Sequence, residues 1–201
     1  MVAGYGCVLG YGTDPKDIVR EFFVLPPYVT RTAHLFERFV EACGATSIEA
    51  QTNDARLTSL LLRYASSVER EKILFSDGFT SELENPGVTF RRTTDADRRA
   101  RSRTTDEMGD WVLTMGDQVV ASGGVLFHYN VPYGDVHMEV ESSFRRRGYG
   151  SFLVQELKRA CYQMGRVPAA RCDITNTASR ATLEKAGMVP CAYLLKGTLH
   201  V

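Results

Sequence analysis

In the second half of the chain, short apolar runs alternate with turns before the apolar spacing changes to that of a helix. Val- and Phe-rich runs bounded by turns predict strands, whereas apolar residues three and four apart predict helices. Gly165 and Gly187 follow the two helical stretches as natural stops. The expected elements are strands at 111–115, 118–129, 136–140, 169–174 and 192–195 and helices at 148–164 and 177–186.

The first half repeats this order of elements. Glu41-Ala42-Cys43, before a strand and Thr52-Asn53, echoes Arg159-Ala160-Cys161, before a strand and Thr175-Asn176. We interpret the two halves as an internal repeat. The stretch 93–110 is dense in Arg, Asp and Thr, lacks apolar periodicity and separates the two ordered regions. In the first half we expect strands at 5–11, 18–24 and 47–51, a turn at 13–17, and helices at 35–43 and 57–64.

The composition is that of a globular protein. Of 201 residues, 44% are hydrophobic and 24% charged, and the formal net charge is zero, so bulk electrostatics indicate neither a nucleic-acid nor a membrane partner. No aromatic residues interleave with the arginines of 98–103, and no apolar run is long enough to span a membrane. The five cysteines form no C-x-x-C pair, which predicts reduced thiols in the cytoplasm and no metal site.

The stretch 140–150 joins the end of a predicted strand to the start of a predicted helix through a loop with two glycines. The helix N-terminus offers unpaired N–H groups and a dipole that favours an anion. Gly148 and Gly150 would let a phosphate approach the backbone, and Arg145–Arg147 add positive charge. A dinucleotide fingerprint would need glycine at Leu153, and no Walker A sequence is present. The loop therefore predicts a pyrophosphate site, while a solvated basic loop without a ligand remains the alternative.

Two motifs resemble the GNAT superfamily of N-acyltransferases. Arg145-x-x-Gly148-x-Gly150 after an apolar strand is similar to its acyl-CoA loop, Q/R-x-x-G-x-G/A. Asn176-x-x-Ser179, followed by 185–188 (Lys-Ala-Gly-Met), is similar to its second motif. The resemblance covers residues 87–201, and reaches the first half only through the repeat.

The resemblance implies an α+β (mixed α/β) fold: a twisted, mostly antiparallel sheet, flanked by helices, that splays open where the pantetheine arm of acetyl-CoA enters like a strand. Leu183 stands where many members have a tyrosine that protonates the leaving thiolate, and Ser142 where many have proline. The segment between Phe90 and Trp111 is short and polar for the helices that usually form the acceptor wall. The residues implied in cofactor binding are Val140, Arg145, Arg146, Arg147, Gly148, Tyr149, Gly150, Ser151, Asn176 and Ser179.

In the first half, Val29, Thr32 and His34 occupy the positions of the loop arginine and both glycines. Side chains there would block a phosphate. We therefore expect a tandem pseudo-repeat, with a degenerate GNAT-like half at 1–86 and an acyl-CoA-binding GNAT domain at 87–201.

The resemblance implies an N-acetyltransferase that transfers an acetyl group from acetyl-CoA to an amine by direct attack. The alternative is a non-catalytic acyl-CoA-binding or regulatory module. Strand alternation places Asp135, His137 and Glu139 on one face of the strand, unless a bulge intervenes. Glu139 is the first candidate for the general base, because it lies next to Val140, and His137 is the second. Pairing of Glu139 with a loop arginine remains open, as do the acceptor and the oligomeric state.

Overall fold

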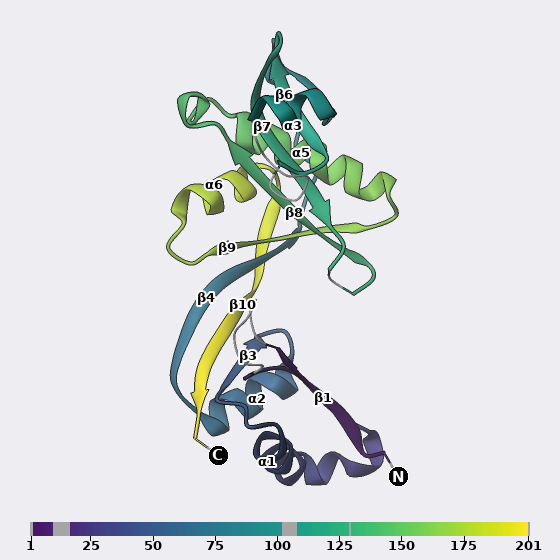
Figure 1. Cartoon of the computed structure of the whole chain (residues 1–201), viewed down its shortest axis with the longest axis vertical. Coiled ribbons are helices and arrows are strands. Elements are labelled where there is room, and N and C mark those ends of the chain that lie inside the picture. The colour runs from purple at the N-terminus through teal and green to yellow at the C-terminus, as the bar shows by residue number, and fades with distance from the viewer. Residues whose placement is uncertain (1, 10–16, 102–107, 129, 201) are drawn as a thin grey trace. The chain divides into compact units, whose positions relative to one another are not determined.

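The computed structural model describes residues 2–9, 17–101, 108–128 and 130–200. The chain forms two compact units, whose elements can be followed by colour in Figure 1. Unit 1 comprises Met1–Ile73 and Ala192–Val201, and unit 2 comprises Leu74–Cys191. Strands β4 (Ala65–Asp77) and β10 (Met188–Leu199) contribute residues to both units.

Unit 1 packs two amphipathic helices against a small sheet. Asp54 caps the second helix by accepting hydrogen bonds from the N–H groups of Arg56 and Leu57, and Gly44 ends the first helix at φ 67°. The elements are β1 (Gly4–Leu9), β2 (Ile18–Val24), the 3-10 helix η1 (Pro26–Arg31), α1 (Thr32–Cys43), β3 (Ser47–Gln51) and α2 (Ala55–Tyr64). The core contains Val19, Phe36, Val40, Ile48, Ala50, Leu57, Leu60, Leu61, Tyr64 and Leu195.

The C-terminal strand completes unit 1. Within this unit, β1 pairs antiparallel with β2, β2 pairs parallel with β3, and β3 pairs antiparallel with β10. Leu194–Thr198 of β10 lie opposite Ser47–Gln51, and Leu195 belongs to the core. The C-terminal part of β10 therefore belongs to the same unit as β1 and β2.

Unit 2 contains further strands of the sheet, with helices packed against them. In the sheet order, β4 is next to β9, which is followed by β8, β7, β6 and β5. Helix α5 packs on β7 and β8, where the side chain of Leu157 lies over Gly123. The remaining elements are β5 (Thr89–Arg92), α3 (Asp95–Arg101), β6 (Trp111–Met115), β7 (Gln118–Leu126), β8 (Tyr133–Val140), the 3-10 turn η2 (Ser142–Phe144), α5 (Tyr149–Gln163), β9 (Val167–Asp173) and α6 (Thr177–Lys185).

The polar stretch after Arg92 contains a helix that the sequence analysis did not predict. The buried carboxylate of Asp97 accepts hydrogen bonds from the N–H and hydroxyl of Thr94, and both oxygens accept from the guanidinium of Arg91, at 2.7 and 2.8 Å. The Arg91 guanidinium holds the pKa of Asp97 well below its usual range. These polar anchors fix α3 without an apolar face.

The predicted fold class is confirmed: the fold is mixed α/β, with mostly antiparallel pairing and flanking helices. The order β2-α1-β3-α2-β4 recurs as β8-α5-β9-α6-β10, and both β2/β3 and β8/β9 are parallel. Strand β10 is longer than the expected strand at 192–195, and β4 was not predicted. Of the segments interpreted from the sequence, residues 10–11, 13–16, 102–107 and Tyr129 lie outside the described residues. The compact units divide the chain after residues 73 and 191; the roles assigned to 1–86 and 87–201 stay a prediction.

Candidate functional site

Strands β8 and β9 begin as a parallel pair and then separate. Their register covers three residue pairs and ends at Asp135 opposite Ala169. Beyond these residues, β8 continues to Val140 and β9 to Asp173 without pairing to each other. In Figure 1 the two ribbons diverge toward the end at which β8 leads into α5. This is the splay that the sequence resemblance implies.

Where β9 has separated from β8, the backbone N–H and C=O groups of the even-numbered residues of β8 point toward the splay. Pairing between β7 and β8 is regular from Asp135 to Val140, with no bulge. The N–H of Glu141 donates to the carbonyl of Val120, so in antiparallel alternation the odd-numbered residues of β8 bond to β7. The N–H and C=O groups of Met138 and Val140 therefore point toward the splay. The carbonyl of Val140 accepts a 3.1 Å hydrogen bond from Nε of Arg145.

The loop after β8 turns sharply into α5. The turn η2 begins at Ser142 without the proline that is common there, and two later residues are left-handed: Arg146 at φ 63° and Gly148 at φ 84°. A left-handed arginine is strained by about 1–3 kcal/mol, as is typical of backbone that is shaped for a ligand. No side chain caps α5 at Gly148, whereas Asn176 caps α6. The first N–H groups of α5 thus stay available for an anion.

The two loop glycines serve different purposes. A Cβ on Gly148 would meet only Nδ2 of Asn85, at 3.6 Å, so glycine is favoured there by the left-handed backbone rather than by lack of space. A Cβ on Gly150 would lie 3.1 Å from Cγ2 of Thr182 and 3.4 Å from Cγ2 of Val140. Gly150 therefore allows α5 to pack closely on α6 and β8. Close approach of a phosphate to the Gly150 backbone, the reason given from the sequence, stays a prediction.

The other predicted cofactor residues of the loop divide into exposed and inward-facing side chains. Arg145, Arg146 and Arg147 are exposed, and the guanidinium of Arg147 lies 5.4 Å from the centre of the Phe144 ring. Tyr149 is buried, with its hydroxyl 3.9 Å from the sulfur of Met115, and Ser151 is buried as well. Tyr149 and Ser151 can thus offer only their backbone N–H groups to a ligand.

Residues of the second motif form the start of α6. Asn176 and Ser179 cap this helix, since Oδ1 of Asn176 accepts from the N–H of Ser179 at 2.9 Å. One turn later Thr182 contacts the start of α5, so both residues lie on the helix that borders the loop. Leu183 is buried, at 4% exposure, and carries no proton for a leaving group.

The candidate bases share the face of β8 that is opposite α5. Glu139 is exposed, while His137 is half-buried and its Nε2 lies against Gly124, on the neighbouring strand. Within the described residues, neither ring nitrogen of His137 forms a hydrogen bond. Burial lowers the pKa of His137, although Asp135 and Asp110 act in the opposite direction. Burial therefore favours the neutral form of His137, which is able to accept a proton.

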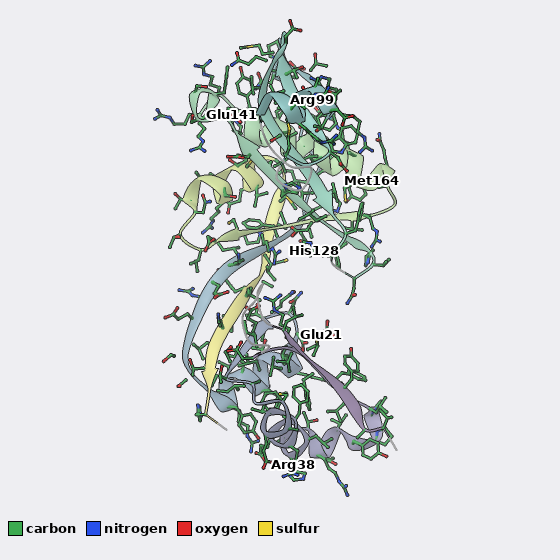
Figure 2. All side chains as sticks on the ribbon, viewed as in Figure 1. Glu21, Arg38, Arg99, His128, Glu141 and Met164 are labelled. Atoms are coloured by element: carbon green, nitrogen blue, oxygen red, sulfur yellow. The ribbon has the colours of Figure 1, made fainter. Side chains whose placement is uncertain are left out.

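A polar cluster around the buried Asp135, which the sequence analysis did not predict, lies where β8 and β9 are still paired. Oδ2 of Asp135 is 3.0 Å from Nε2 of His128 and 3.4 Å from Nε of Arg171. Burial raises the pKa of Asp135, although the neighbouring Arg171, His128 and His137 act in the opposite direction. Figure 2 shows His128 at this end of β8 and Glu141 at the other. The cluster fixes the closed end of the splay.

No group of three or more His, Cys, Asp or Glu side chains suited to a metal ion occurs in the part of the chain that the structure describes. Among the same residues, no helix is long and apolar enough to cross a membrane.

Comparison with known proteins agrees with this geometry. The acetyltransferase (GNAT) family matches residues 76–188, more than half of the chain. None of the curated proteins matches the chain in sequence.

Solved structures show the same fold across the whole chain. A GNAT-family acetyltransferase from Colwellia psychrerythraea has a TM-score of 0.82 at 13% identity, with 100% of this chain and 82% of that chain covered. A GCN5-related N-acetyltransferase from Sphaerobacter thermophilus has a TM-score of 0.63 at 14% identity, covering 99% and 78%. A tandem GNAT protein of clavulanic acid biosynthesis has a TM-score of 0.58 at 12% identity, covering 94% and 77%. The family match, the loop and the splayed strands lead to one conclusion: this chain belongs to the GNAT family of acetyltransferases.

Proposed function

We propose that the protein transfers an acetyl group from acetyl-CoA to an amine, and that unit 2 binds the cofactor. The observation that carries the proposal is the separation of β8 from β9 after Asp135, next to a helix N-terminus without a side-chain cap. One such site combines an open strand edge for an amide-containing arm with N–H groups for a pyrophosphate. Acetyl-CoA carries both groups.

The loop would bind the pyrophosphate. The N–H groups at the start of α5, between Gly148 and Ser151, would donate to phosphate oxygens, and the helix dipole favours the same charge. The exposed arginines of 145–147 would add charge-assisted hydrogen bonds. Both contributions weaken as salt concentration rises, because the site is at the surface.

The pantetheine arm would lie along β8, with its amides on the backbone groups of Met138 and Val140. An arm that starts at the loop and extends into the splay would bring its thioester toward the closed end, where β8 still pairs with β9 at Asp135. An arm in this direction would put the thioester closer to His137 than to Glu139. We therefore rank His137 first as general base and Glu139 second, in the reverse of the order inferred from the sequence.

In the proposed reaction, neutral His137 takes a proton from the acceptor's ammonium group. The free amine attacks the thioester carbonyl carbon, and a β8 N–H that points into the splay stabilises the negative charge that develops on oxygen. Collapse of the tetrahedral intermediate breaks the carbon–sulfur bond. The thiolate then takes its proton from the attacking nitrogen or from water, because buried Leu183 cannot supply one.

Unit 1 would bind no cofactor. At the position that corresponds to the loop, η1 continues directly into α1, and the hydroxyl of Thr32 bonds to the carbonyl of Val29 at 2.6 Å. Thr32 has right-handed helical backbone, unlike Gly148 at φ 84°. This start of a helix has neither the left-handed turn nor the glycines of the loop in unit 2.

The test is a panel of amines with acetyl-CoA in which release of free thiol is followed. The panel should include small amines, amino acids, aminated antibiotics and peptides with free N-termini. We expect at least one amine to give thiol release at a rate proportional to enzyme, and His137→Ala to reduce it. The buried Leu183 favours a second candidate, a non-catalytic acyl-CoA-binding module. Stoichiometric binding of acetyl-CoA without thiol release from any amine would support that candidate and contradict transfer.

A further inference from the structure

Between β4 and β5 the chain follows an extended path without regular secondary structure, and this path is fixed by polar side chains of α5. We call residues Gly78–Asn85 the anchor segment. The N–H groups of Gly78 and Phe79 donate to the carbonyl of Gly187 at 3.0 Å. The segment therefore starts against the end of α6 before it runs along α5.

Two buried polar residues of α5 hold the middle of the anchor segment. Nζ of Lys158, 5% exposed, donates to the carbonyl of Phe79 at 2.8 Å. Gln155, 3% exposed, accepts from the N–H of Leu83 at 2.7 Å and donates to its carbonyl at 3.1 Å; it also accepts from the hydroxyl of Ser81. Because each buried polar group has a partner here, these bonds fix the segment on the helix.

The last residue of the anchor segment reaches the candidate cofactor loop. Nδ2 of Asn85 donates to the carbonyl of Arg147 at 3.3 Å, and it lies 3.6 Å from the position that a Cβ on Gly148 would occupy. In a trans peptide, the C=O and the following N–H point in opposite directions. An amide side chain that holds the Arg147 carbonyl on one side therefore turns the Gly148 N–H to the other side.

We propose that Asn85 is a positioning residue of the acetyl-CoA site: it holds the Arg147–Gly148 peptide so that the Gly148 N–H faces the pyrophosphate. This inference rests on the proposed function, because it assigns the loop to that ligand. The peptide adjoins the left-handed residues Arg146 and Gly148, and glycine allows the backbone there many other conformations. The hydrogen bond from Asn85 restricts these conformations before the ligand binds, and such preorganisation increases affinity.

The experiment compares the full-length parent with Asn85→Ala, Asn85→Gln and the control Glu82→Gln, which changes an exposed residue of the same segment. Titration calorimetry gives the Kd of acetyl-CoA. Ligand-observed NMR gives the Kd of pantetheine, which has the arm but no pyrophosphate. Thermal melting reports the fold.

For Asn85→Ala we expect the Kd of acetyl-CoA to rise roughly three- to tenfold, the effect of one net hydrogen bond. The Kd of pantetheine and the melting temperature should stay at the parental values, as should all three quantities in Glu82→Gln. Asn85→Gln, which keeps the donor, should recover part of the affinity.

Three outcomes would overturn the assignment. Parental acetyl-CoA affinity in Asn85→Ala would show that Asn85 has no role in binding. Equal losses for acetyl-CoA and pantetheine would show a general structural effect rather than an effect on the pyrophosphate. A parent that binds no acetyl-CoA would instead refute the proposed function, and the role of Asn85 with it.

Discussion

Replacing Gly148 by alanine separates the cofactor loop from the stability of the fold. The backbone at Gly148 has φ 84°, where an L-residue with a Cβ costs about 1–2 kcal/mol. The new Cβ meets no atom closer than Nδ2 of Asn85 at 3.6 Å, so no clash adds to this cost. Gly148→Ala should fold and melt a few degrees below the parent, and the strain of the left-handed conformation should favour relaxation of the turn.

This strain should lower the affinity for acetyl-CoA. Relaxation of the turn would withdraw at least one N–H from the pyrophosphate, and a charge-assisted hydrogen bond is worth about 1.5–3 kcal/mol. The Kd measured by calorimetry should therefore rise roughly 10- to 150-fold.

The matched control is Gly165→Ala, just beyond the other end of α5. Gly165 has φ 71° and a Cβ there would meet nothing within 4 Å, so its conformational cost is similar. This variant should lose similar stability but bind acetyl-CoA like the parent. The reasoning is refuted if both variants bind with the same affinity, because left-handed backbone at Gly148 would then have no part in binding.

Three further predictions concern the base, the stoichiometry and the C-terminal strand. His137→Ala should lower kcat roughly 10²–10⁴-fold with nearly unchanged acetyl-CoA affinity. Because burial lowers the pKa of His137, activity of the parent should fall with acidification only below pH 6.5, the ordinary histidine value, as the base becomes protonated. Glu139→Gln should show the same loss of activity at low pH. If this loss disappears in Glu139→Gln but persists in His137→Ala, Glu139 is the base instead. Calorimetry should find one acetyl-CoA per chain, since Thr32 and His34 replace the glycines in unit 1, and two sites would disprove degeneracy. Deleting residues 192–201 should abolish the folding of unit 1, because β3 would lose its antiparallel partner, and proteolysis of residues 17–73 should become faster. Protease resistance equal to that of the parent would show that unit 1 folds without this part of β10.

The helices were predictable because their signals are local. An apolar face predicts α1 and α5, and the glycines after them adopt left-handed backbone at Gly44 and Gly165, as expected for helix stops. Helix α3 gave no such signal, since it is fixed by the ion pair between Asp97 and Arg91 rather than by apolar residues. Strand β4 was missed because it is rich in Glu, Lys and Arg and its sheet neighbours, β9 and β10, come far later in the chain.

The candidate site was predictable in its loop and not in its surroundings. The spacing of Arg145, Gly148 and Gly150 marks the turn between strand and helix. The sequence cannot reveal that a side chain at Gly150, unlike one at Gly148, would crowd a neighbouring helix, because that depends on the position of Thr182. Nor can it reveal Asn85, which contacts the loop from 62 residues away. Polar residues at 151, 155 and 158 were the available hint, since their spacing of three and four places them on one face of α5, where all three are buried.

Residue-resolved amide hydrogen exchange on β8, with and without acetyl-CoA, tests the central claim most directly. In the free protein the amides of His137 and Glu139 bond to β7, whereas those of Met138 and Val140 face the splay. We predict that acetyl-CoA slows exchange at Met138 and Val140 and at the start of α5, and changes His137 and Glu139 little. Binding of acetyl-CoA that leaves exchange at Met138 and Val140 unchanged would place the cofactor elsewhere and contradict the account.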